Sequence, residues 1–117
     1  MADDNQHMPK RATRDRYRVI VLPILRPIGQ RLVLDNWLAI TIARWIFAWR
    51  PLDDVELAHE VAHVRQWRDN GFFGYIYAYM GESRRAKARG GDRYFDNKFE
   101  VEARAAADAV RKRETPV

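Results

Sequence analysis

The segment from Asp53 to Gly71 specifies a single helix with two chemically different faces. Asp53 is a good N-cap, and Glu56 three residues later completes a capping-box pattern. Asn70-Gly71 is typical of a helix C-terminus. Between these ends an apolar stripe and a neighbouring polar face alternate at helical spacing: the first is Leu57, Val61 and Val64, and the second is His59, His63 and Gln66.

The polar face of this helix carries a His-Glu-x-x-His pattern. His59 and His63 are four residues apart, so both imidazoles point the same way and can hold one zinc ion. Glu60 can reach the open side of such a metal as a general base. The only other histidine of the chain is His7, in a polar leader. A zinc-dependent hydrolase, with Zn²⁺ as cofactor, is therefore the leading hypothesis.

A catalytic zinc site normally takes three protein ligands and a water molecule, so one ligand is still to be found. The chain has no cysteine, which excludes thiolate ligands and disulfides and leaves a carboxylate for the third position. Downstream of the motif the acids are Asp69, Glu82, Asp92, Asp96, Glu100, Glu102, Asp108 and Glu114. Glu100 is favoured because it lies near the start of a helix capped by Asn97. Glu102 lies about 200° around that helix from Glu100, so both cannot face one metal.

The combination of His-Glu-x-x-His with a downstream Glu-x-x-Ala, here Glu100 to Ala103, resembles the gluzincin metallopeptidases. The stretch 96–103 is similar to that of very small single-domain members, the minigluzincins. The resemblance covers roughly residues 39–108 and implies His59, His63 and Glu100 as metal ligands, with Glu60 as the catalytic base. It also implies an endopeptidase whose peptide or protein substrate lies extended along an edge strand, which we place within residues 39–49.

One position departs from the gluzincin pattern. Where those enzymes often place an aspartate that accepts a hydrogen bond from a zinc-bound histidine, this chain has Arg104, which cannot accept one. We expect Asp108 or a backbone carbonyl to orient the imidazoles instead. The oxyanion donor of such enzymes has three possible counterparts here, each more often a core aromatic: Tyr75, Tyr79 and Tyr94.

The order of the predicted elements indicates an α+β fold, with a small mixed or antiparallel sheet of three to four short strands followed by three helices. We predict strands at 16–22, 31–34, 39–43 and 45–49, and a turn over 23–30, which holds two prolines and a glycine. A buried helix over 37–49 is the alternative for that apolar run. The three helices are expected at about 53–70, 72–88 and 98–111, with the zinc site between the first and the third. The aromatic residues of 72–79 are most simply core packing, and a hydrophobic substrate-binding wall or a membrane-facing patch is the alternative.

Length and composition bound the remaining possibilities. The chain of 117 residues is expected to form a flexible leader, 1–13, and one zincin-like metallopeptidase domain, 14–117. We expect a cytoplasmic protein, since no secretory signal is visible and the most apolar run is too short to span a bilayer. In so small a domain the leader or the tail, 111–117, can lie in the groove and make the enzyme latent, and an oligomer is possible.

Two other classes of function compete with the peptidase. One is a zinc-stabilised but non-catalytic scaffold or partner-binding module, in which Glu60 would have no chemical role. The other is a basic nucleic-acid binder using the cluster around Arg84, although the net charge of +5 arises from Lys and Arg interspersed with acids. The absence of any nucleic-acid motif places this class last, and no nucleic-acid partner is expected.

Overall fold

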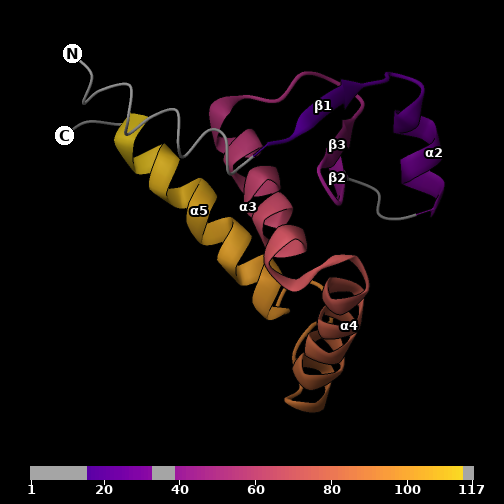
Figure 1. Ribbon diagram of the computed structural model, residues 1–117, viewed down its shortest axis with the longest axis vertical. Coiled ribbons are helices and arrows are strands. Elements are labelled where there is room, and N and C mark those ends of the chain that lie inside the picture. Colours follow the sequence, from indigo (N-terminus) through magenta and orange to yellow (C-terminus); the bar gives the residue numbers. More distant parts are fainter. Residues whose placement is uncertain (1–15, 33–38, 115–117) are drawn as a thin grey trace.

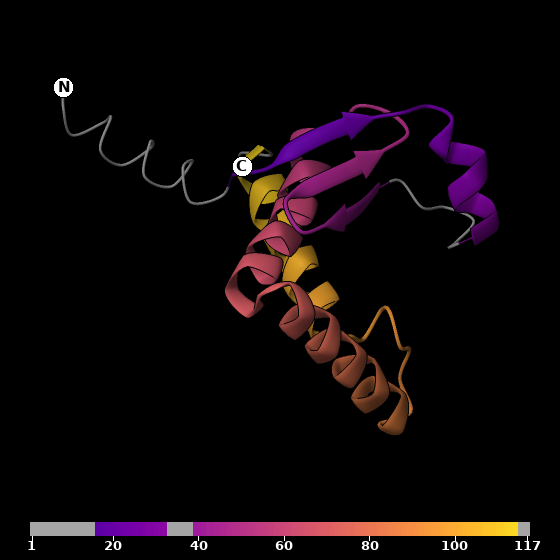
Figure 2. The same ribbon diagram turned by 45° about the vertical axis from the view of Figure 1, so that its right-hand side comes forward.

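A three-stranded mixed sheet forms the first layer of the computed structural model, which describes residues 16–32 and 39–114 (Figure 1). Strand β1 (Arg18–Val21) runs parallel to β3 (Trp45–Ala48), and β2 (Ala39–Ile42) runs antiparallel to β3, which gives the order β1-β3-β2. Figure 2 shows the opposite direction of β2. The predicted α+β fold is confirmed, and in the described part of residues 37–49 strands form rather than a helix.

A two-residue turn joins β2 to β3. Ile42 pairs with Trp45, so Ala43 and Arg44 alone reverse the chain, and Ala43 takes a positive φ of 57°. This conformation costs an L-residue about 1–2 kcal/mol, which the pairing of the two strands must offset. The turn leaves β2 at the edge of the sheet, because among the described strands it pairs only with β3.

Helix α2 (Leu25–Leu32) lies beyond one end of the sheet, where a turn and a further strand were predicted. The predicted turn over 23–30 is confirmed only at residues 23 and 24 and is wrong from residue 25 onward, where the helix begins. The strand predicted for 31–34 is wrong in its described half. Pro23 precedes the helix, and Pro27 lies in its first turn, where a backbone N–H would have no acceptor within the helix. The prolines therefore start this helix rather than prevent it. Residues 33 and 34, the leader 1–13 and the last three residues of the tail lie outside the described residues.

Three helices of 17 residues each follow the sheet: α3 (Asp54–Asn70), α4 (Phe72–Ala88) and α5 (Lys98–Glu114). The predicted capping box is present, since the Glu56 N–H donates to the Asp53 side chain at 2.7 Å and the Asp53 N–H donates to Glu56 at 3.0 Å. Gly71, with φ of 76°, separates α3 from α4. The Asn97 side chain accepts from the Phe99 N–H at 2.8 Å and so caps α5 as predicted.

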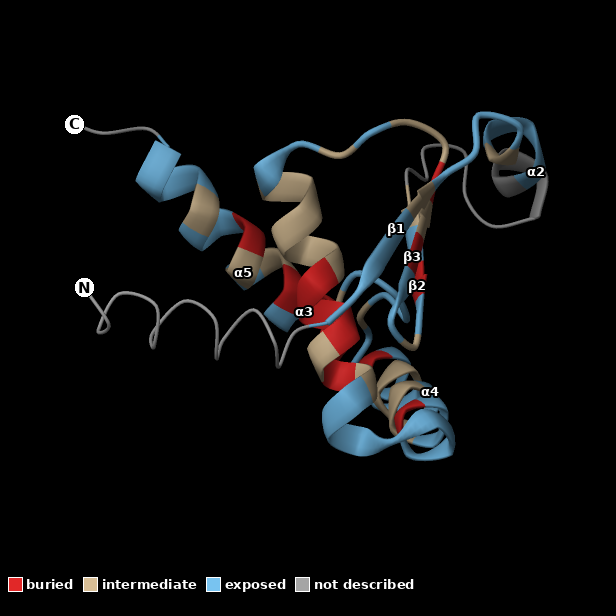
Figure 3. Cartoon of the chain, turned by 45° about the horizontal axis from the view of Figure 1, so that its top comes forward, coloured by how far each residue is buried: buried red, intermediate tan, exposed pale blue. Residues whose placement is uncertain are grey.

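The core lies between the sheet and α3, with α5 alongside α3 (Figure 3). Ile46 of β3 is fully buried against Val61 and Val64, which belong to the predicted apolar stripe of α3. The buried Ala103 and Ala107 form a small-residue face on α5, and small side chains allow two helices to approach closely. Because α3 contacts both the sheet and α5, its apolar stripe and its histidine face are covered by different elements.

The aromatic segment of α4 only partly joins this core. Tyr75 is buried and packs against the rings of Trp67 and Phe99. Phe73 and Tyr77 are exposed, so the prediction that the aromatic residues of α4 pack in the core is wrong for the outer face of the helix. Within the described residues, no helix combines the length and apolar character needed to cross a bilayer.

Candidate metal centre

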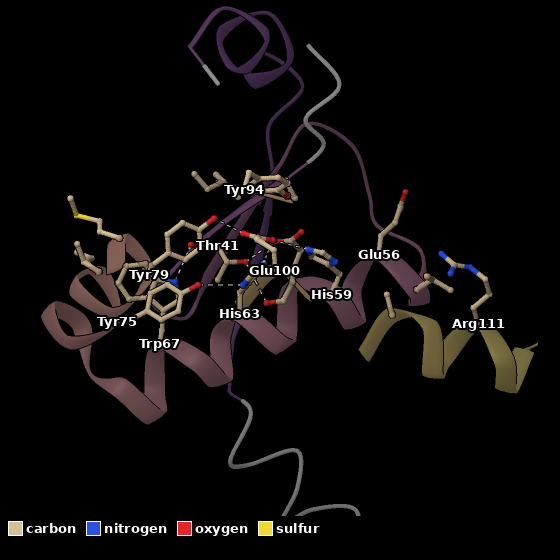
Figure 4. A pocket seen from close by; sticks show the side chains of 17 residues that line it. Thr41, Glu56, His59, His63, Trp67, Tyr75, Tyr79, Tyr94, Glu100 and Arg111 are labelled. Atoms are coloured by element: carbon tan, nitrogen blue, oxygen red, sulfur yellow. Dashed lines mark hydrogen bonds and ion pairs between the residues drawn. The ribbon is translucent and has the colours of Figure 1, made fainter. Parts of the chain in front are cut away.

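The two histidines of α3 lie one helical turn apart and face α5. Their ring centroids are 5.0 Å apart and their planes meet at 72°. His63 is buried and His59 is half-buried, because the first is nearer the middle of the helix. Figure 4 shows both imidazoles pointing toward one side chain, that of Glu100.

Glu100 brings the oxygen that the histidine pair lacks. It lies in the first turn of α5, and its carboxylate is almost fully buried. Oε1 lies 3.1 Å from Nε2 of His63 and 3.6 Å from Nε2 of His59. Among the described residues, these three side chains form the one group of acids and histidines whose ligand atoms all lie within 4.8 Å of one another. The structure therefore brings together the three residues that the sequence predicted as ligands.

The spacing of these atoms suits a zinc ion. At metal–ligand distances near 2.1 Å, two ligand atoms of a tetrahedral site lie about 3.4 Å apart. The two nitrogen–oxygen distances, 3.1 and 3.6 Å, fall on either side of that value, and all three ligand atoms lie within 4.8 Å of one another. Two imidazole nitrogens and one carboxylate oxygen also match the donor set of catalytic rather than structural zinc sites. The residues present thus fit the metal that the sequence pattern implies.

The charges within the group hold it together without a metal. Burial alone would raise the pKa of Glu100, but hydrogen bonds from His59, His63 and Tyr79 outweigh burial and keep this pKa far below its usual value. Burial alone would likewise lower the pKa of His63, but the bond to Glu100 and the charges of Glu100 and Glu60 raise it. A cation bound at this point would replace the proton that His63 shares with Glu100.

Gln66, one turn after His63, determines which nitrogen of that imidazole carries the proton. The Gln66 Nε2 donates to the Phe99 carbonyl at 3.0 Å and to Glu102 at 3.1 Å, so its Oε1 must be the atom that lies 2.8 Å from His63 Nδ1. An amide oxygen only accepts, and Nδ1 therefore donates. A cation that replaced the Nε2 proton shared with Glu100 would leave a neutral imidazole with its remaining proton on Nδ1, which is the form that ligates a metal through Nε2.

The acceptor that orients His63 is Gln66, whereas Asp108 or a backbone carbonyl was expected in this role. Among the described residues, neither Asp108 nor a backbone carbonyl bonds to His63 Nδ1, and Asp108 instead pairs with Arg111 on the exposed side of α5. Arg104 donates to the Phe95 carbonyl and lies 3.8 Å from the centre of that ring. A side chain on the same helix as the histidine thus supplies the acceptor that was sought on α5, because α3 itself turns Gln66 toward α5.

The tyrosines of α4 close the group from the opposite side. The Tyr79 hydroxyl donates to Glu100 Oε2 at 2.7 Å, which leaves Oε1 for the histidines. The Tyr75 hydroxyl donates to Gln66 Oε1 at 3.3 Å. Both hydroxyls are thereby engaged with site residues rather than directed at open space. Tyr94, from the α4–α5 connection, borders the same space, and burial together with the charges of Glu100 and Glu60 raises its pKa to about 12.

Glu60 is positioned by the edge strand. Thr41 Oγ1 of β2 donates to Glu60 Oε1 at 2.9 Å, and Trp67 Nε1 donates to the Thr41 carbonyl at 3.1 Å. Thr41 of β2 is thus bonded to two residues of α3, Glu60 and Trp67. The carboxylate of Glu60 is therefore held beside His59 and His63, on the side that faces the sheet.

These residues line one groove of about 720 Å³. The groove is bordered by Ala39, Ile40 and Thr41 of β2, by α3 along one side, and by residues of α4 and α5 at its two ends. His59, Glu60, His63 and Glu100 all line it. Apart from these four polar side chains, most of the lining is apolar or aromatic.

The contacts that Gln66, Thr41 and Tyr79 make in the site were not predicted from the sequence. The contact of Gln66 could have been, because a residue three positions after His63 lies on the same helical face. Thr41 and Tyr79 give no such signal, since only the packing of β2 and α4 brings them to Glu60 and Glu100. Comparison with protein-family models, curated proteins and solved structures gives no match to this chain.

Proposed function

We propose that this protein is a zinc-dependent endopeptidase of the gluzincin type. The observation that carries the proposal is the convergence of His59, His63 and Glu100, with Glu60 beside them in a groove that an edge strand borders. His59 and His63 would hold the ion through Nε2, and Glu100 would hold it through Oε1. When bound, zinc would polarise a peptide carbonyl as a Lewis acid and lower the pKa of a water molecule from 15.7 to about 7.

Glu60 provides the proton transfers that peptide hydrolysis requires. It accepts a proton from water as the water oxygen bonds to the carbonyl carbon, and it gives that proton to the nitrogen as the carbon–nitrogen bond breaks. The hydrogen bond from Thr41 orients Glu60 Oε1 and leaves Oε2 for the proton. General acid–base catalysis of this kind typically increases the reaction rate by roughly 10²–10⁴-fold.

The edge strand β2 supports the choice of a peptide as substrate. Its outer edge carries backbone N–H and C=O groups to which an extended peptide can bond as an additional strand, apart from the Thr41 carbonyl, which accepts from Trp67 Nε1. Ala39, Ile40 and Thr41 border the groove, so a peptide on that edge would pass beside Glu60. Tyr94 lines the same groove as this edge.

The metal is tested first, by elemental analysis of the tag-free protein after dialysis against zinc-containing and then zinc-free buffer. We expect one zinc per chain, lost in Glu100→Ala and retained in Glu114→Ala, an exposed acid at the other end of the same helix. Zinc retained in Glu100→Ala would show that the third ligand is wrong. No zinc in the unmodified protein would refute the metal site.

The reaction is tested with a mixed peptide library and detection of new termini by mass spectrometry. Glu60→Gln should retain zinc but lose at least about 100-fold of activity, because its amide cannot accept the proton. Asp69→Asn, which changes an exposed acid of the same helix, should be fully active. A zinc-loaded protein that cleaves no peptide would favour the non-catalytic scaffold instead.

A further inference from the structure

The outer face of α4 is apolar and exposed. Phe72, Phe73, Ile76, Tyr77 and Met80 lie within an arc of about 140° on the helix and are all exposed to solvent. Phe73 is 81% exposed and Tyr77 is 79% exposed, so these two rings project almost entirely into solvent. Figure 3 shows much of α4 in pale blue, the colour of exposed residues. Large aromatic side chains held in this way on one helix face mark an interaction surface.

The same face becomes basic in the second half of the helix. Arg84 and Lys87 are exposed and fall inside the arc that the apolar residues occupy. The one acid of α4, Glu82, lies outside that arc and pairs with Arg85 at 2.7 Å. The outer face of α4 therefore presents aromatic rings followed by cations, and α4 itself contributes no carboxylate to it. Beyond the helix, Asp92 lies close enough to Lys87 for the lysine charge to contribute to lowering the pKa of Asp92.

We propose that the outer face of α4 docks on the surface of an anionic lipid bilayer. Aromatic rings are stable at the boundary between headgroups and acyl chains, and tyrosine is well suited to it because its hydroxyl stays in contact with water. Arg84 and Lys87 then meet the lipid phosphates, where each basic residue strengthens binding about fivefold. A helix face that carries cations and no carboxylate of its own, on a chain with a net charge of +5, complements a negative surface.

Docking in this orientation has a consequence for the groove. Ile76 and Met80 belong to the outer face of α4 and also line the groove that contains His59 and Glu100. A bilayer against this face would therefore lie next to one end of the groove. If the proposed peptidase activity is correct, on which this step rests, the substrates are segments of membrane-bound proteins close to the lipid surface. The docking itself does not depend on that activity.

The experiment is sedimentation of the full chain with vesicles of phosphatidylcholine alone or with 30% phosphatidylserine, at low and high salt. We expect binding to the anionic vesicles only, weakened by salt. The pair Phe73→Ser and Tyr77→Ser should weaken binding at least tenfold, because the two aromatic rings that would insert into the bilayer are lost. The pair Arg84→Gln and Lys87→Gln should weaken it roughly 25-fold, whereas Lys112→Gln with Arg113→Gln, on α5, should change it little.

Several outcomes would overturn the docking. The first is that anionic vesicles do not retain the protein, and the second is that both α4 variants bind as the unmodified chain does. A third is a dimer in light scattering that the Phe73→Ser and Tyr77→Ser pair converts to monomer without vesicle binding, which would make this face an interface between two copies. Zinc content, measured on each variant, separates loss of docking from loss of the proposed metal site, which lies on other residues.

Discussion

Replacing Gln66 tests how the site prepares His63 for a metal. Gln66→Met keeps the length of the side chain but removes the acceptor that lies 2.8 Å from His63 Nδ1. The imidazole is then free to place its proton on Nε2, the atom that faces Glu100. Losing a hydrogen bond of this kind to a ligating histidine costs about 10–100-fold in metal affinity, or roughly 1.4–2.8 kcal/mol. We expect zinc binding to weaken by that factor.

The same substitution also affects folding, and a second variant separates the two effects. The amide of Gln66 donates to the Phe99 carbonyl and to Glu102. Gln66→Met removes this donor from the buried Phe99 carbonyl, at a cost of about 1–3 kcal/mol, whereas the exposed Glu102 can bond to water instead. Gln66→Glu retains the acceptor for His63 Nδ1 but places a carboxylate oxygen against Phe99 O and Glu102. It should lose a similar amount of stability while it keeps zinc affinity close to that of the unmodified protein.

The assay is competition with a zinc chelator of known affinity at pH 7.5, paired with thermal unfolding in the presence of EDTA. If Gln66→Met binds zinc as tightly as the unmodified protein, Gln66 does not determine the tautomer of His63. If Gln66→Glu binds zinc as weakly as Gln66→Met, the loss arises from disturbed packing rather than from the missing acceptor. Either result would refute the reasoning from the hydrogen-bond network.

Three further predictions concern the supports of the site. Tyr79→Phe removes the 2.7 Å bond to Glu100 Oε2 and should lower zinc affinity several-fold, measured by the same competition, with an unchanged result arguing against a role in holding the carboxylate. Asn97→Ala removes the cap of α5 and two bonds of a fully buried amide, and should cost about 2–4 kcal/mol in the free energy of unfolding by urea titration; a cost below 1 kcal/mol would contradict it. The hydrogen bond from Arg50 holds the pKa of Glu56 below its usual value of 4.5. The stabilisation from this bond is therefore complete above pH 4.5 and is lost as the pH falls through the lower pKa of the folded state. Glu56→Gln should flatten the pH dependence of the free energy of unfolding in this acidic range.

The helical part of the fold follows from local sequence. Asp53 and Glu56 start α3, Gly71 ends it, and the i,i+4 spacing alone places His59 and His63 on one face. These relations depend only on the geometry of one helix and are therefore readable without tertiary contacts. The limits of α4 and the cap of α5 follow in the same way. Helix α2 was missed because a proline in the first turn was interpreted as a breaker, although the N–H that it lacks has no helical acceptor there.

The completion of the site depends on contacts between elements that are distant in the chain. Glu100 was favoured from its capped helix, but only the packing of α5 on α3 brings its Oε1 within 3.1 Å of His63. The acceptor for His63 proved to be Gln66 rather than Asp108, because the direction of an amide is determined by everything that surrounds it. Thr41 meets Glu60 across 19 positions of sequence. The periodicity of the sequence cannot predict such contacts, because they form only when the sheet and the helices have packed together.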